Sequence, residues 1–166
     1  MNIIDKVGMF RQKSRGSSPT YVVLHHTAGE GLVGAEQTLK ARGYGYHYII
    51  DRKGDIHHYV NVRNTCSHAT DYNAGSIGIS FIGGSSKPEG ACNEEQLKAL
   101  SELLRKLKEE VSTLKYITGH KHINNIGKYD PQFPGEKGGV VNHEIDRKYM
   151  TRIATETGLV FKKVPV

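Results

Sequence analysis

Histidine is the residue type in this chain that combines an unusually high count with chemistry at neutral pH. There are nine histidines in 166 residues, namely His25, His26, His47, His57, His58, His68, His120, His122 and His143. Neutral imidazole binds transition metals, and its pKa lies close to physiological pH, which suits proton transfer. A single buried histidine is more often a satisfied core residue than a ligand. The evidence for a site therefore has to come from how several of them are placed.

Two groups of histidines have the placement expected of a metal site. His25 and His26 are adjacent in a predicted strand, where successive side chains point to opposite faces, so only one of them can face a given site. His120 and His122 lie where another predicted strand runs into a long loop that also carries Asp130. One strand histidine, one loop histidine and one carboxylate make a three-ligand zinc set with the fourth position open to water, which is the catalytic arrangement.

The elements that would position these residues alternate between strand and helix patterns. Tyr21–Thr27 is β-branched and apolar on both faces, as a buried central strand is. Leucines at three- and four-residue spacing over Asn93–Val111 predict an amphipathic helix that begins with Asn93 as N-cap and Gln96 three residues later. Further strands are predicted at 46–50, 56–60, 76–82 and 115–118, and further helices at 34–42 and 142–157.

This order of elements predicts one α/β domain with a central mixed β-sheet flanked by helices. The domain is expected over residues 20–160, with residues 1–19 as an N-terminal segment packing on it and residues 161–166 as a C-terminal tail. The predicted strands at 46–50 and 56–60 flank a turn containing Gly54, which is typical of a β-hairpin. Residues 119–139 form a loop of a length that is usually functional in a compact domain.

Composition and charge limit the classes of function. Hydrophobic residues make up 37% of the chain and charged residues 24%, which excludes a disordered chain, a collagen and a coiled coil. No apolar run approaches the roughly 18 residues of a membrane span. The net charge of +6 suits a polyanionic partner, either nucleic acid or an anionic cell envelope. Without basic runs interleaved with aromatic residues, a stable nucleic-acid partner is not expected.

The cysteines and the N-terminus give expectations about location. Cys66 and Cys92 are too few for a disulfide framework and are expected to be reduced. The first ten residues lack the apolar core of a signal peptide. We therefore expect a protein that stays in the cytoplasm until it is released by other means.

Five motifs in order along the chain resemble those of the type-2 N-acetylmuramoyl-L-alanine amidases, which include the amidase-type phage lysozymes and the peptidoglycan recognition proteins. The motifs run from about residue 20 to about residue 134, most of the chain. They are Val22–Gly29 around His25, Gly45–Ile50, Ser67–Ala69 with Asn73, Ser76–Ile79, and the closing pair Gly119–Lys121 and Lys128–Pro131. Their order is far more specific than any one of them alone.

The resemblance implies a role for particular residues. It makes His25, His120 and Asp130 the ligands of one Zn²⁺ per chain, with aspartate as the variant of a third ligand that is cysteine in many phage members. Tyr46 and Lys128 match catalytic positions. His47, His68 and Asn73 match positions that line the substrate groove.

Two departures from the family pattern affect the expected chemistry. Some branches carry a glutamate as catalytic base just after the Ser-Ile-Gly-Ile motif, where this chain has Ser80. Proton transfer is therefore expected to rest on Tyr46 and the metal-bound hydroxide. The family often has an acidic residue two positions after the closing histidine, where this chain has His122. If that acid supports the metal from outside its ligand shell, either His122 or a different group must replace it.

The expected function is that of a zinc-dependent peptidoglycan hydrolase, a phage endolysin, which cleaves the amide bond between N-acetylmuramic acid and the L-alanine of the stem peptide. The alternative is a non-catalytic peptidoglycan-binding recognition module. The expected partner is peptidoglycan and the expected state a monomer. A second role in regulating a polymerase, known among phage members, is left open.

Overall fold

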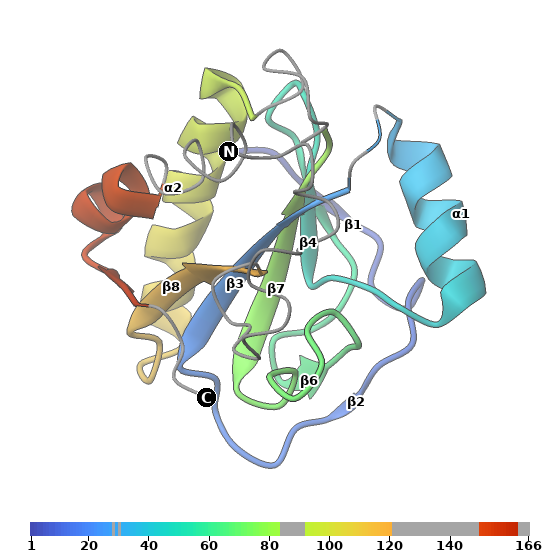
Figure 1. Cartoon of the computed structure of the whole chain (residues 1–166), viewed down its shortest axis with the longest axis horizontal. Coiled ribbons are helices and arrows are strands. Elements are labelled where there is room, and N and C mark those ends of the chain that lie inside the picture. The colour runs from blue at the N-terminus through green and yellow to red at the C-terminus, as the bar shows by residue number, and fades with distance from the viewer. Residues whose placement is uncertain (28, 30, 84–91, 121–149, 163–166) are drawn as a thin grey trace, which may run out of the picture.

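A computed structural model of the chain describes residues 1–27, 29, 31–83, 92–120 and 150–162 (Figure 1). Seven of the described strands form one mixed sheet in the order β1-β5-β4-β7-β3-β8-β9, and β2 pairs with β6 in a separate two-stranded ribbon. The elements are β1 Ile3–Asp5, β2 Lys13–Ser14, β3 Tyr21–His26, α1 Leu32–Arg42, β4 Tyr48–Ile50, β5 Ile56–His58, β6 Asn64–Thr65, β7 Ser76–Phe81, α2 Glu94–Glu110, β8 Tyr116–Gly119 and β9 Val160–Phe161.

The sheet is parallel through its centre and antiparallel at one pair. β3 pairs in parallel with β7 on one side and with β8 on the other, and β4 extends the parallel part beyond β7. The antiparallel pair is the predicted hairpin of β4 and β5. Helices cover both faces, with α2 on one side and α1 on the other (Figure 1). The prediction of a mixed α/β sheet flanked by helices is thus confirmed.

The main hydrophobic core lies between the sheet and α2. Side chains at alternate positions of β3 and β7, such as Val22, Leu24, Ile77 and Ile79, pack there against the leucines of α2. These four side chains are at most 5% exposed. The alternation sends the other set of side chains, which includes Val23 and His25, to the opposite face. That face holds the candidate site.

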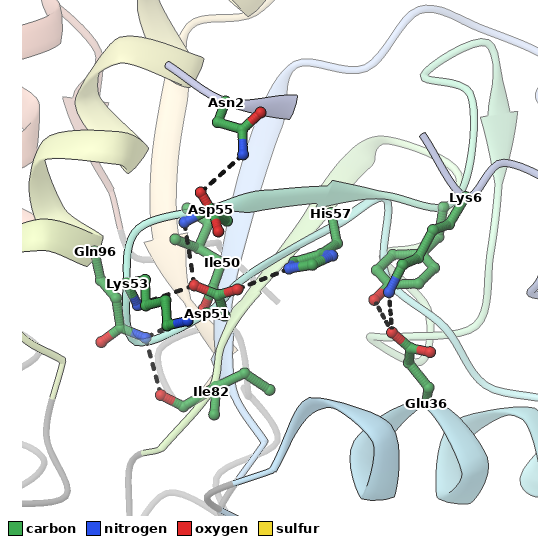
Figure 2. A network of polar contacts seen from close by, with 11 residues as sticks. Asn2, Lys6, Glu36, Ile50, Asp51, Lys53, Asp55, His57, Ile82 and Gln96 are labelled. Carbon is green, nitrogen blue, oxygen red and sulfur yellow. Dashed lines mark hydrogen bonds and ion pairs between the residues drawn. The ribbon is translucent and has the colours of Figure 1, made fainter. Parts of the chain in front are cut away.

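The N-terminus of α2 is capped as predicted and is also tied to the sheet. The Asn93 side chain accepts a hydrogen bond from the Gln96 backbone N–H at 2.9 Å, and the Gln96 side chain accepts one from the Asn93 backbone N–H at 3.0 Å. The Gln96 amide group also donates to the carbonyl oxygens of Ile50 and Ile82 (Figure 2). One buried glutamine therefore both caps the helix and fixes its start against β4 and the end of β7.

Helix α1 is attached to the other face by a few contacts. It has no fully buried residue, and its partly buried Leu32, Ala35 and Leu39 pack on a smaller cluster that includes Ile49 and Ile82. Lys6 and Tyr59 both donate hydrogen bonds to Glu36 on this helix; Figure 2 shows the Lys6–Glu36 pair. Gly43 ends the helix with a φ of +71°, a left-handed conformation that suits glycine.

The turn between β4 and β5 is organised by one carboxylate. Asp51 accepts hydrogen bonds from the backbone N–H groups of Lys53 and Asp55 and from the ring of His57 at 2.8 Å (Figure 2). These hydrogen bonds hold the pKa of Asp51 below its usual value although partial burial opposes them. His57 is thereby a structural residue of the turn.

Four short strands were not predicted. β1, β2, β6 and β9 have only two or three residues each, too few to show a period-two pattern. β1 brings the N-terminal segment into the main sheet as a parallel edge strand beside β5.

The last predicted helix is described only over residues 150–157, where Ile153 is fully buried. Ile145, Tyr149 and the loop from residue 121 on lie outside the described residues. Cys66 and Cys92 are both buried, and no disulfide joins them. Among the described helices, none is long and apolar enough to cross a membrane.

Candidate functional site

His25 and His120 come together because they end two neighbouring parallel strands. β3 and β8 are paired in parallel with Leu24 opposite Gly119, so the residue that follows each of these lies at the same carboxyl edge of the sheet. The ring centroids of His25 and His120 are 4.6 Å apart. The structure therefore juxtaposes two of the three predicted zinc ligands, which lie 95 positions apart in the chain.

Tyr46 and His68 complete this cluster from two loops. The Tyr46 ring centroid lies 4.8 Å from that of His25. The Nε2 atom of His25 lies 3.0 Å from the Nδ1 atom of His68, which is hydrogen-bonding distance. Of the predicted catalytic and substrate-binding residues, these two are in direct contact with the predicted metal ligand.

A chain of hydrogen bonds fixes the tautomer of His68. The Ser76 hydroxyl donates to the Tyr72 carbonyl oxygen at 2.7 Å, so its oxygen is an acceptor for the Nε2–H of His68 at 3.2 Å. With its proton on Nε2, His68 presents an unprotonated Nδ1, which accepts the hydrogen bond from His25. Ser76, at the start of β7, therefore orients the His68 ring that contacts His25.

The backbone around His68 is shaped for this contact. The side-chain oxygen of Asn73 accepts hydrogen bonds from the backbone N–H groups of His68 and Ala69, at 3.0 and 2.8 Å. The His68 ring lies against Gly78 of β7, where a Cβ atom would sit 2.6 Å from the ring. Asn73 thus holds the loop that carries His68, and a contact between Asn73 and substrate stays a prediction.

His47 lies beneath the site instead of lining a groove. Its ring is fully buried, with Nδ1 accepting from the Gly78 backbone N–H at 3.0 Å and Nε2 bonded to the Asn64 carbonyl oxygen at 2.9 Å. Both ring nitrogens are thus engaged inside the protein, which does not fit the predicted contact with substrate. Burial lowers the pKa of His47 to about 3, so the ring is neutral.

The electrostatics of the cluster favour neutral imidazoles and a protonated phenol. Burial first, and then the neighbouring histidines, hold the pKa of His25 well below its usual value, and burial does the same for His68. Neutral imidazole is the form that binds metals. Burial raises the pKa of Tyr46 to about 12, against an opposing interaction with the Ser80 side chain, so the phenol keeps its proton at neutral pH.

A cleft opens from this cluster toward α1. It has a volume of about 480 Å³, and its lining includes Tyr46, Thr27, Thr38, Tyr44 and Arg42. Tyr46 belongs both to this cleft and to the cluster around His25. Tyr46 is therefore the residue through which the cleft adjoins the cluster around His25.

Three predicted residues lie in the part of the chain that the structure does not describe. They are Lys128, Asp130 and His122. Within the described residues, no group of three or more histidine, cysteine or acidic side chains is placed to hold a metal ion. His25 and His120 supply two donors, and the third predicted donor belongs to the region that is not described.

Sequence reasoning missed three residues that shape the site. Ser76 and Gly78 lie within the Ser-Ile-Gly-Ile motif, but nothing in the sequence relates them to His68. Arg15, in the N-terminal segment, has Nη2 3.1 Å from Nε2 of His47 and lies in a stretch that reads only as a loop. No local sequence signal marks it.

A profile of the N-acetylmuramoyl-L-alanine amidase family matches residues 15–133. The chain belongs to this family. The match includes every residue of the cluster described above.

The similar proteins include an endolysin and a peptidoglycan-recognition protein. An endolysin of Klebsiella phage KP32 is 33% identical over 88 residues, which cover 49% of this amidase-family chain and 58% of the endolysin. Peptidoglycan-recognition protein SD of Drosophila melanogaster is 33% identical over 92 residues, which cover 55% of this chain and 47% of that protein. The chain thus spans about half the length of these relatives.

A solved structure extends the likeness to most of the fold. The Ph2119 endolysin from a Thermus scotoductus bacteriophage matches with a TM-score of 0.59 and 26% identity over 74% of this amidase-family chain and 88% of the endolysin. The family and these relatives support a peptidoglycan amidase or a peptidoglycan-recognition protein.

Proposed function

We propose that the chain is a zinc-dependent N-acetylmuramoyl-L-alanine amidase, which hydrolyses the amide bond between N-acetylmuramic acid and the L-alanine of the stem peptide. The observation that carries this proposal is the cluster in which His25 contacts His120, Tyr46 and His68, with Tyr46 also lining the cleft. A recognition module needs only the cleft. Two histidines beside a buried phenol supply two metal donors and a proton donor, which binding alone does not need and zinc-dependent hydrolysis uses.

The donor set fits zinc. His25 and His120 are histidines from adjacent strands at 4.6 Å between ring centroids, and the low pKa of His25 keeps its ring neutral. Together with Asp130 they would hold the ion, leaving one position open for water. A zinc ion bound there would lower the pKa of that water to about 7 and polarise the scissile carbonyl.

The residues of the chain supply orientation and protons. Tyr46 keeps its proton at neutral pH and so can donate a hydrogen bond to the oxygen or nitrogen of the reacting amide. His68 holds the His25 ring through the hydrogen bond between Nδ1 and Nε2. Lys128 is the proposed cation for the oxyanion, on the basis of its match to the family motif. Because Ser80 replaces the glutamate of other branches, no carboxylate base acts at that position.

The cleft fits one end of the proposed substrate. A stem peptide is a slender chain that carries carboxylates beyond its L-alanine. The described residues that line the cleft include the Arg42 cation and the hydroxyls of Thr27 and Thr38, and none of these described residues carries a carboxylate. With the peptide in this cleft, the amide before L-alanine would lie beside Tyr46.

We also propose the biological setting that goes with this reaction. The chain would act as a phage endolysin on peptidoglycan, as a monomer that stays in the host cytoplasm until it is released to the cell wall. The similarity to an endolysin of Klebsiella phage KP32 supports this setting.

Zinc content and lytic activity of strand variants test the proposal. His25→Ala and Asp130→Ala should each lose the metal and the lysis of exposed peptidoglycan. His26→Ala is the matched control, because His26 is on the opposite face of β3, near Phe81. It should keep both zinc and activity. Peptidoglycan binding without zinc or hydrolysis in the wild-type protein would instead identify a recognition module.

A further inference from the structure

Arg15 makes an unusual set of contacts for a residue outside the proposed catalytic cluster. It follows β2, and its half-buried guanidinium donates four hydrogen bonds to backbone carbonyl oxygens. Nε donates to Val62 and Nη1 to Ala74, each at 2.7 Å, and Nη2 donates to Asn64 at 2.7 Å and to Ser76 at 3.0 Å. One side chain thus binds four backbone carbonyl groups from two separate stretches of chain.

These four carbonyl groups flank a single stretch of chain. Val62 and Asn64 precede it, Ala74 and Ser76 follow it, and residues 65–73 between them form what we call the His68 loop. The planar guanidinium carries five N–H donors in a fixed fork, which lets one side chain reach acceptors on both ends of a loop. A lysine ammonium donates from a single point and cannot span both ends in the same way.

The four hydrogen bonds of Arg15 to the backbone, which we call the Arg15 clamp, are connected by further contacts to the proposed catalytic cluster. Arg15 holds the carbonyl oxygen of Ser76, whose hydroxyl accepts the Nε2–H of His68. The His68 ring, confined by Gly78, then accepts the hydrogen bond from His25. Each step along this route is a contact within hydrogen-bonding or van der Waals range.

We propose that Arg15 is a positioning residue for the reaction: it closes the His68 loop at both ends and thereby sets the His68 ring against His25. The N-terminal segment is then a working part of the site and not only a cover on the domain. The kinetic consequence rests on the proposed amidase function, whereas the structural consequence for the loop does not.

The test compares Arg15→Lys with Arg63→Lys, an exposed arginine of the same region whose backbone carbonyl pairs with Arg15. Hydrogen–deuterium exchange is the readout that is independent of activity. In Arg15→Lys, the amides of His68 and Ala69, which donate to Asn73, should exchange faster, while those of α2 stay protected. Arg63→Lys should match the wild type. Unchanged exchange in the His68 loop of Arg15→Lys would overturn the inference.

Kinetics separate positioning from general stability. Arg15→Lys should lower kcat roughly 10- to 100-fold, the scale of a misplaced reacting group, with a smaller change in KM. Ile153→Val, a core substitution packed against α2, should lower the melting temperature without lowering kcat. In a His68→Ala background, Arg15→Lys should have little further effect on kcat. An undiminished effect there would show that Arg15 acts by another route and would overturn the inference.

Two further outcomes, a variant that does not fold and a wild-type protein without amidase activity, are handled separately. If Arg15→Lys does not fold, Arg15→Gln, which keeps N–H donors at a shorter reach, is put through the same comparison with the same deciding results. If the wild-type protein has no amidase activity, the proposed function fails, and the exchange experiment still decides whether Arg15 clamps the His68 loop.

Discussion

The Nδ1 atom of His68 lies 3.0 Å from the Nε2 atom of His25, and the ring of His68 is held there by Ser76 on its far side. A loop residue and a strand residue are thereby joined into one unit. The His68 ring is the group that the His68 loop contributes to the proposed site at this edge of the sheet. The geometry of His25, and with it the proposed metal site, depends on how well the loop is held.

Tyr46→Phe removes the phenolic hydroxyl and keeps the ring that packs beside His25. We expect normal folding, retained zinc and a loss of kcat of about 10²–10⁴, the range for a general acid–base group. Steady-state kinetics on soluble peptidoglycan fragments measure this. Near wild-type turnover in the zinc-loaded variant would make Tyr46 a packing residue.

Gly78→Ala places a methyl group where the His68 ring now lies, 2.6 Å from Cγ and Nδ1. The ring must shift from its present position beside His25, so kcat should fall about 10- to 100-fold. Gly75→Ala is the control, because a Cβ there has no atom within 4 Å. Adding His68→Ala to Gly78→Ala removes the clash between the methyl group and the ring. The double variant should therefore recover any melting temperature lost in Gly78→Ala, but not the activity. Wild-type turnover in Gly78→Ala would contradict the importance of the contact.

Asn93→Ala removes the side-chain half of the capping box at the start of α2. The expected loss is about 1 kcal/mol of unfolding free energy, the usual value for an N-cap, with kcat unchanged because the site is on the other face of the sheet. Urea denaturation measures the loss, and Asn93→Ser should recover most of it. An activity loss at full folding would show unexpected coupling between the two faces.

The stability of the fold should decrease as the pH falls below about 6.5. Burial lowers the pKa of His47 to about 3 in the folded state, while an unfolded histidine has a pKa near 6.5. Between pH 6.5 and pH 3 only the unfolded state binds the proton. The contribution of His47 to the unfolding free energy is therefore complete above pH 6.5 and is lost as the pH falls to about 3. From pH 7 to 5 one such group removes at most about 2 kcal/mol.

Urea unfolding at several pH values measures this slope. His47→Gln offers a donor and an acceptor to the same backbone partners but does not titrate, so its stability should depend less on pH. His25 and His68 act in the same direction and leave a residual slope. If the unfolding free energies of wild type and His47→Gln depended on pH identically, His47 would not contribute to the loss of stability at low pH.

The sequence predicted the parts of the fold that have strong patterns. The apolar run before His25, the leucine spacing of α2 and the Asn93–Gln96 capping box all lie where they were expected. The two- and three-residue strands could not be predicted, because their existence depends on pairing with distant partners, as β1 pairs with β5.

The site was predictable to the extent that it depends on motifs. His25, His120 and Tyr46 were expected together, and the structure places them in contact. The inward position of His47 was not predictable, since the same motif residue can face a groove or the interior. The clamp by Arg15 has no local signal either, because it arises from hydrogen bonds to residues 47 to 61 positions away.

The central claim is hydrolysis of the bond between N-acetylmuramic acid and L-alanine, and mass spectrometry of digested peptidoglycan tests it most directly. The zinc-loaded protein should release stem peptides with a free L-alanine amino group and leave the glycan strands intact. Chelated protein and His25→Ala should release none. Disaccharide products that still carry their peptides, or no products from the zinc-loaded protein, would contradict the account.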